Sequence, residues 1–301
     1  MKKKALPDSG ISISEIQKIL TEDLKVFHDF CEEHGLRYSL AYGTMLGAVR
    51  HDGCIPWDDD VDVFMPRRDY LRFLELAQKK GLYSRAYRIQ TPETDRKYPM
   101  LYIPLKIRSR QATLIEEPKK KYYQGAFIDV FPLDYIGDDE AAFQKLKKKC
   151  AMISSLKMRI SFQELSGIKR YIRILLQLVF KLIPAHALYR WQQKQIQKVA
   201  DNDHAKNRDM TSGIELVMRT VIKEEDFFPL ALHAFGPYAF YIPHNYDSIL
   251  TEEYGDYMTP PTQEQIDKAL HGIFYSDRPY ETYRDVDFSA GIPGKRGLDT
   301  D

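Results

Sequence analysis

Four aspartates crowd into five positions of the chain: Asp58, Asp59, Asp60 and Asp62. Negative charges this close repel one another, so a folded site must give them a cation, exposure to solvent or raised pKa values. Carboxylate oxygens are the hard ligands that Mg²⁺ and Mn²⁺ take in proteins. The run therefore indicates a divalent-metal site. A solvated acidic turn is the simpler alternative, but it gives no reason for the apolar residues on both sides.

The residues after this run alternate between apolar and polar. Val61 and Val63 alternate with Asp60 and Asp62, and this period of two with β-branched side chains predicts a strand. Successive side chains on a strand point to opposite faces. We therefore expect Asp60 and Asp62 to share one face while the valines point into a core.

The other two aspartates depend on where this strand begins. Asp58 joins the face of Asp60 and Asp62 if the strand starts early enough, whereas Asp59 faces away. The spacing also matches the first positions of an EF-hand loop. However, Val63 stands where that loop needs a glycine, so the EF-hand is disfavoured.

A Gly-Thr pair precedes the aspartates. Leu40–Tyr42 reads as the end of a strand, and Gly43-Thr44 turns into a short helix over Met45–Arg50. Backbone N–H groups at the start of a helix attract phosphate, and a small residue lets phosphate approach. One element that holds phosphate followed by one that holds metal is typical of a nucleotidyltransferase-type site.

A third carboxylate and several cations lie further along the chain. Asp129 is embedded in an apolar strand, Phe127–Phe131, where a carboxylate is costly to bury unless it is ligated or hydrogen-bonded. It could be a metal ligand or the acceptor of a proton from an attacking hydroxyl; a hydrogen-bonded structural role is the alternative. Lys106, Arg108 and Arg110 share one face of a predicted strand, which either faces donor phosphates or is solvated.

These residues resemble the signature of the LicD family, which includes bacterial phosphocholine transferases and the fukutin-related ribitol-phosphate transferase. The resemblance rests on the motifs at 42–51 and 55–62, on Gly125–Asp134, and on two later stretches, 242–247 and 254–261. It implies a nucleotidyltransferase fold, a divalent metal, and transfer of a phosphorylated group from a CDP-activated donor to a sugar hydroxyl.

The motifs and the resemblance together give one set of candidate residues. Asp60, Asp62 and Asp129 are the expected catalytic residues, and Asp58 joins them as a metal ligand. Arg50 could neutralise a phosphate or pair with the aspartates. The expected substrate-binding residues are Gly43, Thr44, Arg50, His51, Lys106 and Asn245.

We expect a phospho-alcohol, with phosphocholine as the leading choice, to pass to a cell-surface glycan or its lipid-linked precursor, with CMP leaving and Mg²⁺ or Mn²⁺ as cofactor. The alternatives are a nucleotidyltransferase, an Asp-x-Asp glycosyltransferase and an inactive binding module. The glycosyltransferase is disfavoured by the Gly-Thr turn, and the binding module by the presence of all three carboxylates.

The composition of the chain bears on its binding partners and its cellular compartment. The 301 residues carry 44 Lys and Arg against 43 Asp and Glu, so no basic field suggests nucleic-acid binding. Three widely spaced cysteines form no disulfide or metal pattern, which favours a reducing compartment. Since no apolar run resembles a signal peptide or a span of ~20 residues, a cytoplasmic protein is expected, with possible contact to the inner face of a membrane.

The elements predict an α+β fold: a nucleotidyltransferase-like mixed sheet with flanking helices and a helical C-terminal half. We expect a catalytic core over 1–135, a mainly helical part over 136–285 and a loose tail over 286–301. A helix over 12–34 has a capping box and a terminal glycine. Strands are expected at 85–90, 101–108 and 111–116.

Residues 171–189 are strongly apolar but carry Arg173 and Lys181. A core helix is the favoured interpretation. An amphipathic helix at a membrane interface is the alternative, because the neighbouring residues are basic.

Overall fold

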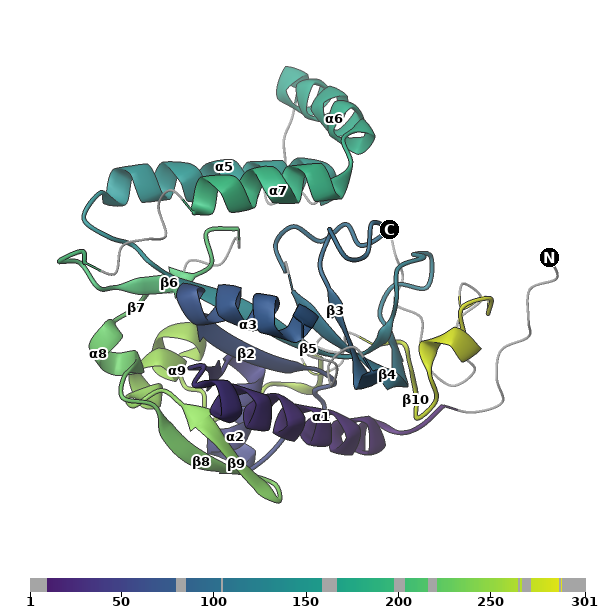
Figure 1. The fold of residues 1–301 in the computed structure, drawn as a ribbon, viewed down its shortest axis with the longest axis vertical. Helices are drawn as coiled ribbons and strands as arrows, with labels where there is room; N and C mark the ends of the chain where they lie inside the picture. Colours follow the sequence, from purple (N-terminus) through teal and green to yellow (C-terminus); the bar gives the residue numbers. More distant parts are fainter. Residues whose placement is uncertain are drawn as a thin grey trace.

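The computed structural model describes residues 10–79, 85–103, 105–158, 167–197, 204–215, 221–264, 266, 272–286 and 288. A mixed, curled sheet lies at its centre, with helices packed against it and a layer of helices beyond (Figure 1). The predicted α+β class is confirmed.

Two parallel strands form the middle of the sheet. β2 (Val61–Pro66) pairs parallel with β5 (Gly125–Tyr135), and the remaining pairs are antiparallel. The strand order is β1 (Ser39–Leu40), β2, β5, β4 (Lys106–Ile115) and β10 (Phe274–Ser276). Three more strands lie off this path: β3 (Tyr87–Gln90) pairs with β4, β6 (Met210–Ser212) with β5, and β7 (Val221–Ile222) with β6.

Two of the predicted strands are one. The division into 101–108 and 111–116 is wrong, because β4 runs without a break from Lys106 to Ile115. The register against β5 shifts between Arg108 and Thr113, so an irregularity inside the strand absorbs the polar residues that looked like a turn. The strand expected over 85–90 is confirmed over Tyr87–Gln90.

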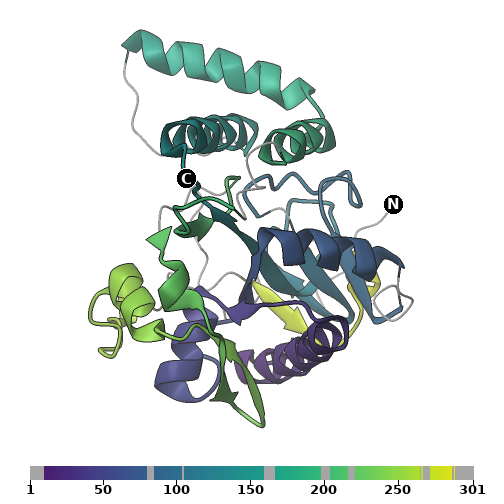
Figure 2. The same ribbon diagram turned by 60° about the vertical axis from the view of Figure 1, so that its left-hand side comes forward.

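Helices α1 (Ile13–His34) and α3 (Arg67–Lys79) pack against the sheet (Figure 2). The start of α1 follows from its capping box, in which Ser12 Oγ accepts from Glu15 N and the Glu15 carboxylate accepts from Ser12 N. Gly35 ends it with φ 61°, in the left-handed region that favours glycine. The predicted helix is confirmed.

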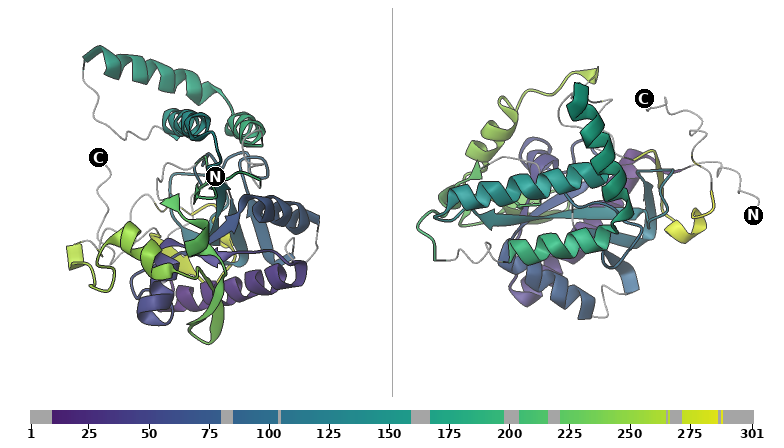
Figure 3. Two further views of the ribbon diagram at one scale, coloured as in Figure 1. Left: turned by 90° about the vertical axis from the view of Figure 1, so that its left-hand side faces the viewer. Right: turned by 90° about the horizontal axis from the view of Figure 1, so that it is seen from above.

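Three helices form a separate layer. α5 (Glu140–Met158) and α7 (Ala185–Ile196) run alongside each other, and α6 (Gly167–Leu182) lies beyond them (Figure 3). The expected helical character of this part is confirmed. The core assignment of 171–189 is wrong for α6, because none of its residues is buried.

After α7 the chain returns to the sheet. Strands β6 and β10 come from later in the chain and pair with strands of the first 135 residues. The pairing does not test the expected domain boundary at 135, which stays a prediction. A two-stranded sheet of β8 (Ala231–Phe235) and β9 (Tyr238–Ile242) lies beside α2 (Tyr42–His51) and β1, and α9 (Tyr246–Tyr254) and the short helices α8 (Glu224–Phe227) and η1 (Tyr280–Thr282) complete this part. Most of the expected tail, 286–301, lies outside the described residues.

Among the described residues, no helix has both the length and the apolar composition to cross a membrane alone. The pair α6 and α7 meets both criteria together, across a bend of 98°.

Candidate metal and phosphate site

Three carboxylates meet where the two parallel strands lie side by side. Asp62 of β2 is the register partner of Asp129 of β5, and Asp60 comes two residues before Asp62. One carboxylate oxygen from each lies within 4.8 Å of the others. The alternation predicted Asp60 and Asp62 on one face, and the parallel pairing brings Asp129 to that face.

The start of α2 is fastened to the same strand. Thr44 Oγ1 accepts a hydrogen bond of 2.9 Å from Asp62 N, and Ala41 N donates to Asp62 O at 3.0 Å. Thr44 is therefore a positioning residue for Asp62, which the sequence did not indicate.

Helix α2 begins earlier than predicted, at Tyr42 rather than Met45. Met45 N donates to Ala41 O, so the amides of Gly43 and Thr44 precede the helical hydrogen-bond ladder. These amides are the kind that bind phosphate. Tyr42 has φ 43°, a conformation rare for an aromatic residue, and such strain is often found beside functional sites.

Asp129 has one satisfied and one unsatisfied oxygen. Its Oδ2 accepts from Lys106 Nζ at 2.8 Å. Its Oδ1 is buried and has no hydrogen-bond partner among the residues that the structure describes. A buried acceptor without a partner is costly, and a divalent cation would satisfy it.

The pKa values of these carboxyls reflect their crowding. Burial, followed by the charge of Asp60, raises the pKa of Asp62 well above its ordinary value and that of Asp58 to about 9. Burial raises the pKa of Asp129 to about 6, although Lys106 opposes this shift. Protons relieve the repulsion among these carboxylates, and a hard divalent cation is the alternative source of positive charge.

Asp58 and Asp59 diverge. Asp58 interacts with Asp60 and lies against Gly43, where an added Cβ would be 2.7 Å from Asp58 Oδ2. Asp59 is fully buried, and its Oδ2 accepts from Gly272 N and from the Tyr275 hydroxyl, both at 2.6 Å. The expectation that Asp59 faces away is confirmed.

The cationic side chains of β4 make ion pairs and hydrogen bonds to other residues of the protein. Lys106 and Arg108 both pair with Glu116, at 3.1 and 2.6 Å, and lower the pKa of that carboxyl to about 2 against the effect of burial. Arg108 is fully buried, so a solvated strand face is wrong for it. Of the three predicted cations, Lys106 contacts the carboxylate cluster, whereas Arg110 donates to Tyr87 O.

Three other candidates lie outside the cluster. Arg50 and His51 are at the opposite end of α2, where Arg50 Nη1 donates to Tyr257 O at 2.6 Å and Arg50 Nε to His51 Nε2 at 3.0 Å. Asn245 caps α9, since its side chain accepts from Ser248 N and donates to Asp226 Oδ1. The hydrogen bonds of Arg50 and Asn245 thus support the fold. The role of these two residues in substrate binding stays a prediction.

A buried ion cluster beside α3 was not predicted from the sequence. Arg67, at the start of α3, donates to both carboxylate oxygens of Asp134 and to both of Glu215. All three side chains are almost completely buried. The cluster ties α3 to the end of β5 and to the segment after β6, and its partners are too far apart in the chain for a local pattern to reveal them.

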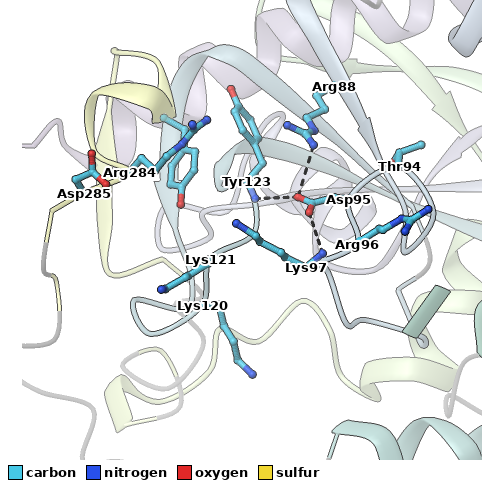
Figure 4. Close-up of a pocket in the computed structure, with 11 residues that line it drawn as sticks. Arg88, Thr94, Asp95, Arg96, Lys97, Lys120, Lys121, Tyr123, Arg284 and Asp285 are labelled. Atoms are coloured by element: carbon cyan, nitrogen blue, oxygen red, sulfur yellow. Dashed lines mark hydrogen bonds and ion pairs between the residues drawn. The ribbon is translucent and has the colours of Figure 1, made fainter. Parts of the chain in front are cut away.

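A basic cavity of about 510 Å³ was missed as well (Figure 4). Asp95 anchors its wall, because it accepts from the amides of Lys97 and Tyr123 and lies 3.9 Å from Arg88. The Lys119–Lys121 run was the signal that could have indicated it. The cations that line the cavity are Arg88, Arg96, Lys97, Lys120, Lys121 and Arg284, against the carboxylates of Asp95 and Asp285.

Buried hydrogen bonds link this cavity to the carboxylate cluster. Gln90 donates to Asp95 and accepts from Arg108. Arg108 pairs with Glu116, which pairs with Lys106 and so reaches Asp129. A fixed network therefore holds the cavity wall and the carboxylates in one arrangement.

Part of the chain matches a known family of proteins. Residues 35–135, which contain β1, α2, β2 and β5, match the family described as "LicD/FKTN/FKRP, nucleotidyltransferase domain". This is the family that the motifs resemble, and all three clustered carboxylates lie within the matched residues.

Among individual relatives, the lipopolysaccharide cholinephosphotransferase LicD of Haemophilus influenzae is 29% identical over 294 residues, which cover 87% of this chain and 97% of that protein. Two uncharacterized Rickettsia proteins match shorter stretches. The one from Rickettsia typhi is 30% identical over 39% of this chain and 35% of its own length, and the one from Rickettsia prowazekii is 27% identical over 51% and 64%.

Proposed function

We propose that this protein is a metal-dependent phosphotransferase that moves phosphocholine from a CDP-activated donor to a sugar hydroxyl of lipopolysaccharide or of a lipid-linked glycan precursor, on the cytoplasmic side. The observation that carries the proposal is the carboxylate cluster in register across two parallel strands, beside the first-turn amides of α2. The reaction named for the Haemophilus relative supports phosphocholine and lipopolysaccharide.

The residues present fit a divalent cation. Asp60, Asp62 and Asp129 would hold it, because they offer clustered carboxylate oxygens and one of these oxygens, Asp129 Oδ1, is buried without a protein partner among the described residues. When bound, Mg²⁺ or Mn²⁺ supplies positive charge that offsets the charge of the diphosphate in the transition state.

Groups of the chain itself would bind the donor, position Asp129 and accept the proton. The amides of Gly43 and Thr44 would take phosphate oxygens of the donor, and Lys106 would hold Asp129 in place through their hydrogen bond. The sugar hydroxyl oxygen forms a bond to the distal phosphorus, the bond between that phosphorus and the bridging oxygen breaks, and CMP leaves with the electron pair. The hydroxyl proton passes to the Asp129 carboxylate, which the strand pairing places in the cluster.

The basic cavity would bind an anionic part of a substrate, such as a glycan phosphate. Six cations line it against two carboxylates, so its field attracts negative charge. The buried network fixes this wall relative to Asp129.

A nucleotidyltransferase is the second candidate, because the matched family domain carries that description. It would leave the cytidylyl group on the acceptor rather than the phospho-alcohol. The two reactions add different masses to the same acceptor.

Incubation with Mg²⁺, a lipopolysaccharide or teichoic-acid precursor, and CDP-choline, CDP-ribitol or CDP-glycerol in turn tests the proposal. We expect CMP release and an acceptor heavier by phosphocholine, and neither product with Asp60→Ala. A cytidylyl adduct, or undiminished turnover by the folded variant, would contradict the proposal.

A further inference from the structure

Helix α6 presents its apolar side to solvent. None of its residues is buried, and large side chains are strongly exposed, including Leu182 at 82%, Ile168 at 75% and Tyr171 at 73%. An exposed apolar surface this continuous marks an interaction site on a soluble domain. The remaining members of the exposed surface are Ile172, Ile174, Leu175, Leu176, Leu178 and Val179.

The side of α6 that faces the protein is largely polar. Its less exposed residues are Arg173, Gln177 and Phe180, which lie on one face at a spacing of four and three residues. This face packs toward α5. A surface helix normally buries its apolar face and exposes its polar face, whereas α6 does the opposite.

The helix is nevertheless held firmly at its end. Lys157 of α5 donates to the backbone carbonyls of Phe180 and Lys181, which stabilises the C-terminus of α6. These contacts use the backbone and leave the apolar side free. The C-terminal end of α6 is therefore anchored to α5 by contacts that do not involve the apolar side chains.

Charge identifies what covers this surface. Lys169, Arg170 and Lys181 are exposed on α6, which carries no acidic residue. A second copy on the same surface would bring like cations together, while the phosphates of anionic lipids would complement them. α5 adds further exposed lysines, Lys145, Lys148 and Lys149.

We propose that α6 docks the protein onto a membrane that contains anionic lipids. The helix lies in the plane of the interface, its apolar side among the acyl chains and its cations at the headgroups. Its 16 residues are too few to span the bilayer, for which ~20 are needed. α7 does not extend it, because Leu188, Tyr189 and Gln192 of α7 are buried in the protein. This docking is independent of the chemistry proposed above.

Sedimentation of the full chain with vesicles, without substrate, tests the proposal. We expect partitioning onto phosphatidylglycerol–phosphatidylcholine vesicles to exceed that onto pure phosphatidylcholine about tenfold or more and to weaken with salt. Leu175→Glu/Leu182→Glu should abolish it with an unchanged melting temperature, since both residues are exposed. The matched control is Leu232→Glu, at a residue 58% exposed on β8, which should bind vesicles as the unmodified chain does.

Equal partitioning of the double variant and the unmodified chain would overturn the proposal. The proposal would also be overturned if the chain did not bind anionic vesicles and formed a dimer in solution that Leu175→Glu/Leu182→Glu converted to a monomer. A second copy of the chain would then cover α6. CMP release on a water-soluble acceptor reports separately on the phosphotransferase.

Discussion

Among single residues, Gly43 leaves room for the carboxylate of Asp58. A Cβ there would lie 2.7 Å from Asp58 Oδ2, so Gly43→Ala must displace that carboxylate and with it Asp60. We expect CMP release to fall about tenfold or more, which corresponds to ~1.4 kcal/mol of barrier, with little change in melting temperature. Gly53→Ala is the control, because its Cβ has ordinary neighbours at 3.7 Å or beyond. Equal activities of the two variants would show that Asp58 does not need its present position.

Protonation of the cluster predicts how stability depends on pH. Folding raises the pKa of Asp58 to about 9 and that of Asp129 to about 6, so the folded chain holds protons that the unfolded chain has lost above about pH 4. Without metal, this cluster therefore makes the protein less stable as pH rises through these values. A divalent cation competes with those protons and relieves the repulsion.

We expect Mn²⁺ to raise the melting temperature more at pH 8 than at pH 6, measured by scanning fluorimetry. Asp60→Asn/Asp62→Asn should abolish the increment at both pH values. An increment that is independent of pH would contradict the raised carboxyl pKa values.

Local sequence patterns predicted those helices and strands that are determined by contacts between residues close together in the chain. The capping box and Gly35 were sufficient for α1, and the alternation at Val61–Val63 was sufficient for β2 and its face. The pairing of Asp62 with Asp129 was expected only loosely, because parallel register depends on contacts between distant segments. β4 was divided in two since a bulge looks like a turn, and α6 was assigned to the core because amphipathicity does not tell which side faces inward.

The Arg67 cluster should be the electrostatic contact on which the attachment of α3 depends most. Arg67→Met leaves the buried carboxylates of Asp134 and Glu215 without their cation, and we expect a loss of about 3–5 kcal/mol in the free energy of unfolding. Arg190→Met removes an exposed pair with Glu93 and should cost about 1 kcal/mol or less. Urea unfolding compares the two, and equal losses would mean that Arg67 is not a buried structural cation.

At the scale of the whole molecule, the sheet brings the two proposed binding regions together. The basic cavity and the carboxylate cluster share a buried network that crosses β3, β4 and β5. The sequence indicated the carboxylates because their types repeat locally. It did not indicate the cavity, because Arg88, Lys121 and Arg284 come from separate segments.

Charge reversal in the cavity should therefore change binding rather than chemistry. Lys121→Glu is expected to raise the KM for an anionic substrate about tenfold with kcat nearly unchanged, as removal of uniform binding does. Lys119→Glu makes the same charge change two residues away, at a residue that does not line the cavity. Matching KM values for the two variants would exclude the cavity as a substrate site.

We propose that the clustered carboxylates hold the metal that phosphotransfer requires. CMP release from CDP-choline, measured as Mg²⁺ is raised in the unmodified chain, Asp62→Asn and Asp52→Asn, decides whether they do. Asp52 is an exposed aspartate at the end of α2, outside the cluster, and its φ of 52° suits asparagine. We predict saturable Mg²⁺-dependent release by the unmodified chain and Asp52→Asn, and at least about a hundredfold less by folded Asp62→Asn. Release by Asp62→Asn with the same Mg²⁺ dependence as the unmodified chain would show that these carboxylates do not hold the metal.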